Sequence, residues 1–186
     1  GELESLRYAD FRSTGVSAEN VAKLDFDPEK LVMLFQEELL NSWWVRLPES
    51  WRSHLNREYK TGLNPGTIEL HSLAARLELS LKSLDINTLE PVSMFYRLRK
   101  LDISGSRISN LGPLVNMKQL EELNASRVPV EDLQALSGLT HLRVLLIEQT
   151  PVGDLKALSG LTNLEILRCS GTAVRDLSPL SDLKKL

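Results

Sequence analysis

The sequence predicts an α/β fold in which residues 67–186 form a right-handed solenoid of about five repeats, with a curved parallel sheet on one side. Three observations lead to this prediction. Leucine recurs every 22 residues, at positions 98, 120, 142, 164 and 186. Other apolar positions repeat with the same period. Each repeat also contains one segment with the alternation of a β-strand and one with the spacing of a short helix.

The strand is expected at the pattern L-x-x-L-x-I, as in residues 98–103, because its apolar residues alternate and its β-branched members favour extended backbone. Its ladder is Leu79, Leu101, Leu123, Leu145 and Leu167, followed two residues later by Leu81, Ile103, Ala125, Ile147 and Cys169. One repeat is too small to bury its own apolar edge. Neighbouring repeats must therefore stack, and their strands must form one parallel sheet.

The rest of each repeat turns back on the opposite, convex side. Residues 136–139 and 158–161 place leucines three apart, which predicts one turn of α- or 3₁₀-helix. Asp132, Asp154 and Asp176 recur just before a ladder leucine. They could be cation ligands, but aspartate is common at helix starts, so we expect them to cap the helical turns.

With these residues in view, residues 70–186 resemble the short bacterial leucine-rich repeats of the internalin type, L-x-x-L-x-x-L-x-x-L-x-I-x-x-T-x-V-x-D-L. The chain departs from the usual turn asparagine, since Ser106, Val128, Thr150 and Thr172 hold that position. A hydroxyl can still bond to a neighbouring backbone group, but Val128 cannot, so the polar ladder should be interrupted there. The resemblance implies protein recognition without naming the partner.

Residues 17–66 lack the repeat and are expected to form a helical cap or insertion. Asp27-Pro28 predicts a helix start, with Leu31, Leu34, Phe35 and Leu39 on one face, and a second helix is expected to begin at Pro48. In the main interpretation the tryptophans, Trp43, Trp44 and Trp51, are core residues of a cap that covers the end of the solenoid. In the alternative, Trp43 and Trp44 are an exposed anchor for a partner.

The repeat pattern also recurs near both ends of the chain. Residues 6–17 align with residues 98–109, so residues 1–16 are either a partial repeat, with the helical pair as an insertion, or an extended arm. Leu186 occupies the first ladder position. We therefore expect the natural protein to continue with another repeat, and the solenoid to be truncated here.

Composition narrows the possible partners and sites. The net charge of -3 and the interspersed basic residues argue against nucleic acid, and no apolar stretch is long enough to insert into a membrane. Cys169 is the only cysteine, so no internal disulfide is possible. The compartment stays open between the cytoplasm and the cell surface or exterior after removal of a signal. We expect a monomer, with association through an uncapped C-terminal end as the alternative.

The strand residues between the buried ladder positions should point to the concave face, which solenoids generally present to partners. The predicted rows are Glu78, Lys100, Glu122, Val144, Ile166, then Ser80, Asp102, Asn124, Leu146, Arg168, then Lys82, Ser104, Ser126, Glu148, Ser170. Val144, Leu146 and Ile166 should form an apolar cluster rimmed by Glu122, Glu148 and Arg168. The predicted partner-binding residues are this cluster and its rim, together with Asn124, Lys100 and Asp102.

No catalytic, metal or cofactor site is predicted. His54, His71 and His141 lack ligand spacing, and Cys169 lies on a core ladder, where a thiol behaves as a small apolar group. The expected function is therefore a protein-binding scaffold. The alternative is an architectural spacer within a larger protein, and it predicts an inert concave face.

Overall fold

The computed structural model describes residues 8–11, 14–17, 20, 23, 32–34 and 37–186, which divide into two compact units. The first unit comprises Gly1–Arg76 and Met94–Arg97. The second comprises Leu77–Ser93 and Leu98–Leu186 and contains the repeats. The first unit thus extends past residue 66, where the helical segment was predicted to end.

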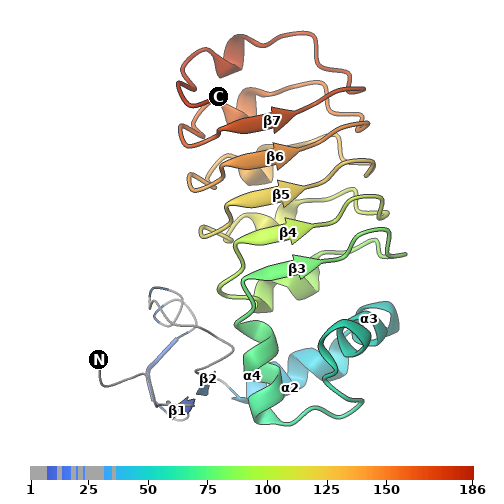
Figure 1. Ribbon diagram of the computed structural model, residues 1–186, viewed down its shortest axis with the longest axis vertical. Helices are drawn as coiled ribbons and strands as arrows, with labels where there is room; N and C mark the ends of the chain where they lie inside the picture. The colour runs from blue at the N-terminus through green and yellow to red at the C-terminus, as the bar shows by residue number, and fades with distance from the viewer. Residues whose placement is uncertain (1–7, 12–13, 18–19, 21–22, 24–31, 35–36) are drawn as a thin grey trace. The chain divides into compact units, whose positions relative to one another are not determined.

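The second unit is built on a five-stranded parallel sheet in the order β3-β4-β5-β6-β7 (Figure 1). The strands are β3 Glu78–Ser80, β4 Lys100–Asp102, β5 Glu122–Asn124, β6 Val144–Leu146 and β7 Ile166–Arg168. Each residue pairs with the residue 22 positions later, as in Leu101 with Leu123. The predicted strand positions and their period are confirmed.

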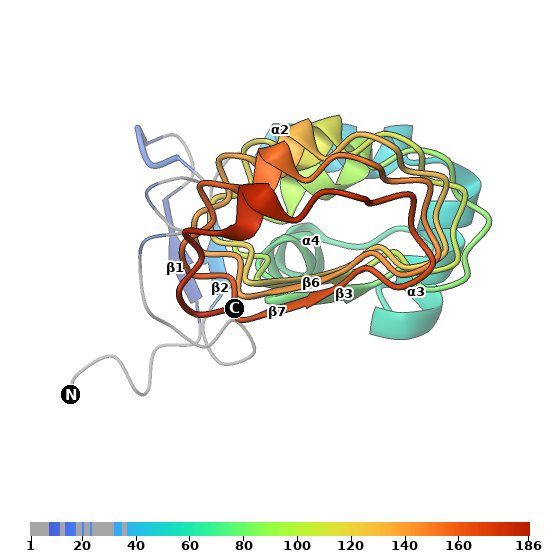
Figure 2. The same ribbon diagram turned by 90° about the horizontal axis from the view of Figure 1, so that it is seen from above.

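Five 3₁₀-helices lie on the side of this unit opposite the sheet (Figure 2). They are η1 Glu90–Met94, η2 Gly112–Leu114, η3 Gln134–Leu136, η4 Lys156–Leu158 and η5 Ser178–Leu180. The three aspartates predicted as caps do accept backbone hydrogen bonds, from Gln134 to Asp132 at 2.7 Å, Lys156 to Asp154 at 2.8 Å and Ser178 to Asp176 at 2.8 Å. Asn110 does the same for Gly112 at 2.7 Å.

The core of the second unit lies between the sheet and the 3₁₀-helices. Leu98, Leu120, Leu142 and Leu164 are at most 1% exposed. The ladder residues are less buried near the C-terminal end of the solenoid. Leu177 is 62% and Leu186 47% exposed, and Cys169 is half-buried. The prediction that Cys169 lies at a buried core position is therefore wrong, because no described strand packs beyond β7.

The turns after β6 and β7 carry the expected hydroxyl ladder. Thr150 Oγ1 donates to the Ile147 carbonyl at 2.8 Å, and Thr172 Oγ1 donates to the Cys169 carbonyl at 2.7 Å. Val128 interrupts this ladder and is only 2% exposed, so its side chain joins the core instead.

Helices α2 Glu37–Arg46, α3 Glu49–Tyr59 and α4 Thr67–Ala74 dominate the described part of the first unit. Its buried side chains include Trp44, Trp51, Leu55, Leu70 and Leu73. Pro48 stands immediately before α3, as predicted, and Lys60 ends the helix with a left-handed backbone at φ 54°.

The first predicted helix, with Leu31, Leu34, Phe35 and Leu39 on one face, is wrong in part. The Asp27-Pro28 start lies outside the described residues, but Val32–Leu34 forms strand β2, and α2 begins only at Glu37. A short apolar run does not distinguish a strand from a buried helix by its period alone. Here the run pairs as a strand, with parallel strand β1, Tyr8–Asp10.

Strand β1 coincides with the segment that aligned with a repeat, because Tyr8–Asp10 matches Lys100–Asp102 in that alignment. The following turn also repeats the solenoid's hydrogen bonds. Thr14 Oγ1 donates to the Phe11 carbonyl at 2.6 Å and accepts from the Val16 N–H at 3.2 Å, as Thr172 does with Cys169 and Val174. These bonds favour the partial-repeat interpretation over an extended arm for the described part of residues 1–16.

Candidate functional site

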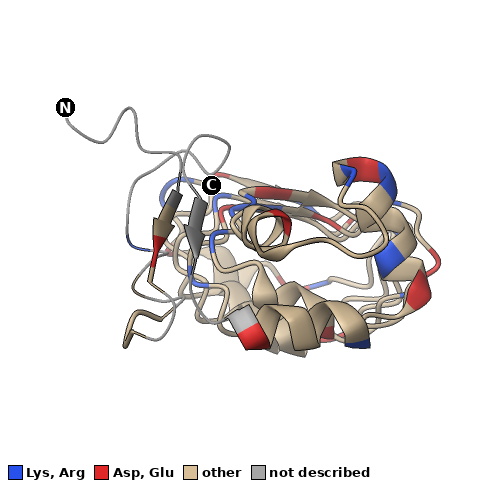
Figure 3. Ribbon diagram, turned by 90° about the horizontal axis from the view of Figure 1, so that it is seen from below, with Lys and Arg blue, Asp and Glu red and all other residues tan. Residues whose placement is uncertain are grey.

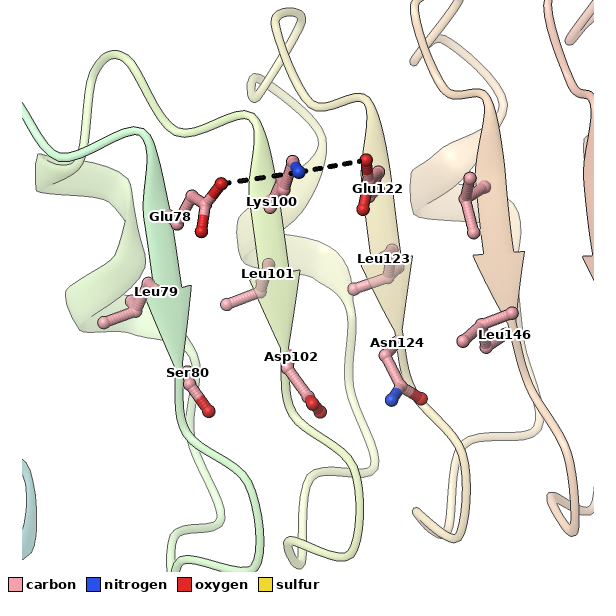
Figure 4. Close-up of a pocket in the computed structure, with 11 residues that line it drawn as sticks. Glu78, Leu79, Ser80, Lys100, Leu101, Asp102, Glu122, Leu123, Asn124 and Leu146 are labelled. Carbon is pink, nitrogen blue, oxygen red and sulfur yellow. Dashed lines mark ion pairs between the residues drawn. The ribbon is translucent and has the colours of Figure 1, made fainter.

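The candidate site lies on the face of the β3–β7 sheet that points away from the core, which we call the concave face. Within each strand the central leucine points inward, and Leu79, Leu101, Leu123 and Leu145 are at most 2% exposed. The residues on either side point outward (Figure 4). The strand pairing places them in two continuous rows, Glu78, Lys100, Glu122, Val144, Ile166 and Ser80, Asp102, Asn124, Leu146, Arg168.

The first row begins with a chain of ion pairs. Lys100 Nζ lies 3.4 Å from Glu78 Oε1 and 3.3 Å from Glu122 Oε1 (Figure 4). The hydrogen bond that Lys100 donates to Glu122, with the negative charges of both glutamates, raises the pKa of the lysine above its usual value. Lys100 therefore remains protonated, and its charge is already matched by two carboxylates.

The second row is oriented by hydrogen bonds to the backbone. Asp102 Oδ1 accepts from the Ser104 N–H at 2.8 Å, and Asn124 Oδ1 accepts from the Ser126 N–H at 3.1 Å. Each side chain is therefore held against its own turn. The same bond holds an aspartate in one repeat and an asparagine in the next, so the two residue types are interchangeable for this local geometry.

The two rows enclose a hollow of about 330 Å³ on the concave face. The outward side chains that line it are Glu78, Ser80, Lys100, Asp102, Glu122, Asn124, Val144 and Leu146. One end is polar. The other is aliphatic, because it is formed by Val144 and Leu146, which are half-buried on β6. Ile166, next to Val144 on β7 and 47% exposed, extends this aliphatic surface beyond the hollow.

The structure brings six of the predicted binding residues together in this hollow, namely Lys100, Asp102, Glu122, Asn124, Val144 and Leu146. Ile166 and Arg168 are exposed on the adjacent strand β7 but do not line the hollow. Glu148 follows β6 and accepts a hydrogen bond from Ser170 Oγ at 3.1 Å. Glu78 and Ser80 line the hollow although they were not among the predicted binding residues, and their place in the two predicted rows was the signal that could have found them.

Ser104 and Ser126, which were predicted to point to the concave face in the third row, are instead buried. They are 1% and 7% exposed. Alternation applies only while the backbone is extended. Strands β4 and β5 end at Asp102 and Asn124, and the chain then bends, so the two serines turn inward.

The tryptophan alternative needs exposed indoles, and the structure does not provide them. Trp44 is 5% exposed, and its indole N–H donates to the Leu63 carbonyl at 3.4 Å. Trp43 is half-buried, with its ring 6.3 Å from Trp44 and 5.8 Å from Phe95, edge to face with the latter. Both residues are thus packed within the first unit.

The side chains that could act as catalytic groups or metal ligands are dispersed. His71 is fully buried, with Nδ1 2.8 Å from the Thr67 carbonyl, and His54 Nδ1 lies 3.2 Å from a guanidinium nitrogen of Arg57. Among residues 8–11, 14–17, 20, 23, 32–34 and 37–186, no group of three or more His, Cys, Asp or Glu side chains could hold a metal ion. Acidic and basic residues lie interspersed on the described helices and strands (Figure 3).

Comparison with solved structures places this geometry among known solenoids. An internalin, InlF, from Listeria monocytogenes matches with a TM-score of 0.60 and 26% identity, over 63% of this chain and 35% of the internalin. Internalin C2 from the same organism matches with a TM-score of 0.61 and 27% identity, over 63% of this chain and 52% of that protein. The repeats are internalin-like. The predicted resemblance and fold class, an internalin-like leucine-rich-repeat solenoid, are confirmed.

The internalin-like solenoid matches only part of each of these proteins, about half of internalin C2 and about a third of InlF. No protein-family model and no curated protein sequence matches the chain. No helix in the described part of the chain is both long and apolar enough to span a lipid bilayer.

Proposed function

We propose that the internalin-like solenoid is a protein-binding scaffold whose partner docks on the concave face. The observation that carries the proposal is the hollow on that face, which joins a polar end to the aliphatic cluster of Val144, Leu146 and Ile166. Exposed apolar clusters with a polar rim are typical of protein interaction surfaces. The similar solved structures are internalins, and this similarity supports a recognition scaffold at the level of fold.

The rigidity of the sheet also favours this function. The hollow is formed by side chains on four consecutive hydrogen-bonded strands, and Asp102 and Asn124 are fixed by bonds to their own turns. A preformed surface of this kind loses little conformational entropy when a partner binds. Affinity can therefore come from a modest number of contacts.

The test compares three forms of the full chain as bait in lysate and surface extracts of the source organism and of any host. These are the wild type, the concave variant Leu146→Glu with Ile166→Lys, and the control Val115→Glu. Val115 follows η2 on the convex side and, like Ile166, is 47% exposed, so the control places a charge on an equally exposed aliphatic residue elsewhere.

We expect a partner that is captured by the wild type and by Val115→Glu but lost by the concave variant, with all three proteins melting alike. Identical capture profiles for the three baits would contradict the proposal. They would favour the spacer function, in which the concave face is inert.

A further inference from the structure

The charge on the concave face points to the chemistry of its partner. The hollow is lined by three carboxylates, from Glu78, Asp102 and Glu122, and by one ammonium group, from Lys100, which gives a formal charge of -2. A concave surface lined by one sign of charge concentrates the field and attracts the opposite sign. The polar end is therefore suited to a cation and unfavourable for an acidic segment or a phosphate.

Within this polar end, Asp102 is the carboxylate best placed to receive that cation. Glu78 and Glu122 already share Lys100 between them. In the part of the chain that the structure describes, no ion pair involves Asp102, whose Oδ1 accepts only the Ser104 backbone N–H. A basic group from a partner would meet a carboxylate that is oriented and not yet neutralised, a combination that favours a charge-assisted hydrogen bond.

The aliphatic end shows what else the partner must supply. Val144, Leu146 and Ile166 provide only branched aliphatic surface, and the second unit contains no Phe, Trp or Tyr. Aromatic side chains commonly dominate binding energy at interfaces. At this interface any such anchor must come from the partner.

Resting on the proposed function, we infer that the partner docks a protein segment in which a Lys or Arg lies close to a bulky apolar side chain. The cation sits against Asp102, and the apolar side chain sits against Val144, Leu146 and Ile166. Leu146 is two strands from Asp102 in register, which is about 10 Å at the usual strand spacing. Long basic and aromatic side chains two positions apart on a strand, or three to four apart on a helix, can span this separation.

The chain offers a matched pair of variants for testing the charge. Asp102→Asn removes the carboxylate but keeps an oxygen for the Ser104 N–H, as Asn124 does for Ser126 in the next repeat. Asn124→Asp adds a carboxylate at the equivalent position. Each variant puts into one repeat the residue that its neighbour already carries, so both should fold.

The probe is the peptide most enriched when a random peptide library is panned on the full wild-type chain. We expect selected peptides to pair Lys or Arg with a large aliphatic or aromatic residue. The Kd of the leading peptide should rise about tenfold in Asp102→Asn, fall in Asn124→Asp and rise with added salt. Leu146→Glu should abolish binding, whereas Val115→Glu should leave the Kd unchanged.

Peptides that lose binding in Leu146→Glu but are acidic or neutral, and that ignore both charge variants, would overturn this inference while leaving the proposed function intact. If Leu146→Glu leaves the selected peptides bound, or if no peptide is enriched, the proposed function fails together with the inference.

Discussion

Leu145 and Leu146 are adjacent in strand β6 but are assigned to opposite faces of the sheet, so truncating each of them tests the register on which the candidate site depends. Leu145 is 0% exposed in the core, whereas Leu146 is half-buried and lines the hollow. A one-residue slip of a strand would exchange the two faces. Leu145→Ala and Leu146→Ala should therefore have very different effects on the free energy of unfolding.

The expected difference follows from burial. Leu145→Ala removes three carbon groups from a dry environment, which costs about 2.4 kcal/mol in transfer free energy at roughly 0.8 kcal/mol each. The cavity left between neighbouring ladder leucines adds to this, giving a total of about 3–4 kcal/mol. Leu146 already contacts solvent, so Leu146→Ala should cost about 1 kcal/mol or less.

The assay must report on the repeats and not on the helices. All tryptophans and tyrosines belong to the first unit, so intrinsic fluorescence does not follow the solenoid. Native-state hydrogen exchange at the amides of Ile103, Ala125 and Ile147, each of which bonds to the next repeat, measures its opening directly. Equal destabilisation by the two variants, or a larger effect from Leu146→Ala, would refute the assigned register.

Three further predictions concern the turns and the charges of the solenoid. Gln149→Gly should raise the free energy of unfolding by about 0.5–1 kcal/mol in denaturant titrations, because Gln149 holds a left-handed backbone at φ 56°, and Gly171→Ala should lower it, since Gly171 has φ 71°. A loss of stability in Gln149→Gly would contradict the assigned backbone. Ser104→Ala should raise the free energy of unfolding by up to about 1 kcal/mol, because the structure shows no hydrogen-bond partner for this buried hydroxyl among the described residues. Thr150→Ala should lower the free energy of unfolding by about 1 kcal/mol, because the Thr150 hydroxyl donates a hydrogen bond to the Ile147 carbonyl. Equal changes in the free energy of unfolding for Ser104→Ala and Thr150→Ala would contradict these two assignments. The Ser178 backbone N–H lowers the pKa of Asp176, and the hydrogen bond from Arg143 lowers the pKa of Glu165. Because both folded-state pKa values lie below the unfolded ones, this stability is present above about pH 4 and is lost as the pH falls through the folded values. Asp176→Asn with Glu165→Gln should therefore lose less Tm in acid than the wild type, and parallel acid profiles would show that these groups do not contribute.

The repeat architecture was predictable because the apolar residues that determine it recur at a fixed interval. A leucine every 22 residues fixes which residues face the core, and the same count gives the neighbours across the sheet. The concave rows followed from the alternation on either side of Leu101 and Leu123. The prediction failed where the alternation stops, at Ser104 and Ser126, since sequence alone did not show that each strand is only three residues long.

The left-handed turn after each strand could not be predicted from residue type. The positions are Ser83, Gly105, Arg127, Gln149 and Gly171, of which only two are glycine. The conformation is imposed by hydrogen bonds between repeats. The Arg127 N–H, for example, donates to the Glu148 carbonyl at 2.8 Å, and the Gln149 N–H donates to the Ser170 carbonyl at 2.8 Å.

The first unit was harder to predict because it has no repeating pattern to separate strand from helix. The run containing Val32–Leu34 fits one helix face as well as it fits a strand, and its pairing with Tyr8–Asp10 depends on residues far away in sequence. Helix α3 was predictable, since Pro48 and the spacing of Trp51 and Leu55 act locally.

The measurement that tests the binding function most directly is site-specific photo-cross-linking of a captured partner. A photoreactive side chain is placed at position 166 on the concave face or at position 115 on the convex side, where the native residues are equally exposed. We predict that the label at position 166 cross-links to the partner and that the label at position 115 does not. Cross-linking from position 115 alone would show that the concave face is not the binding site.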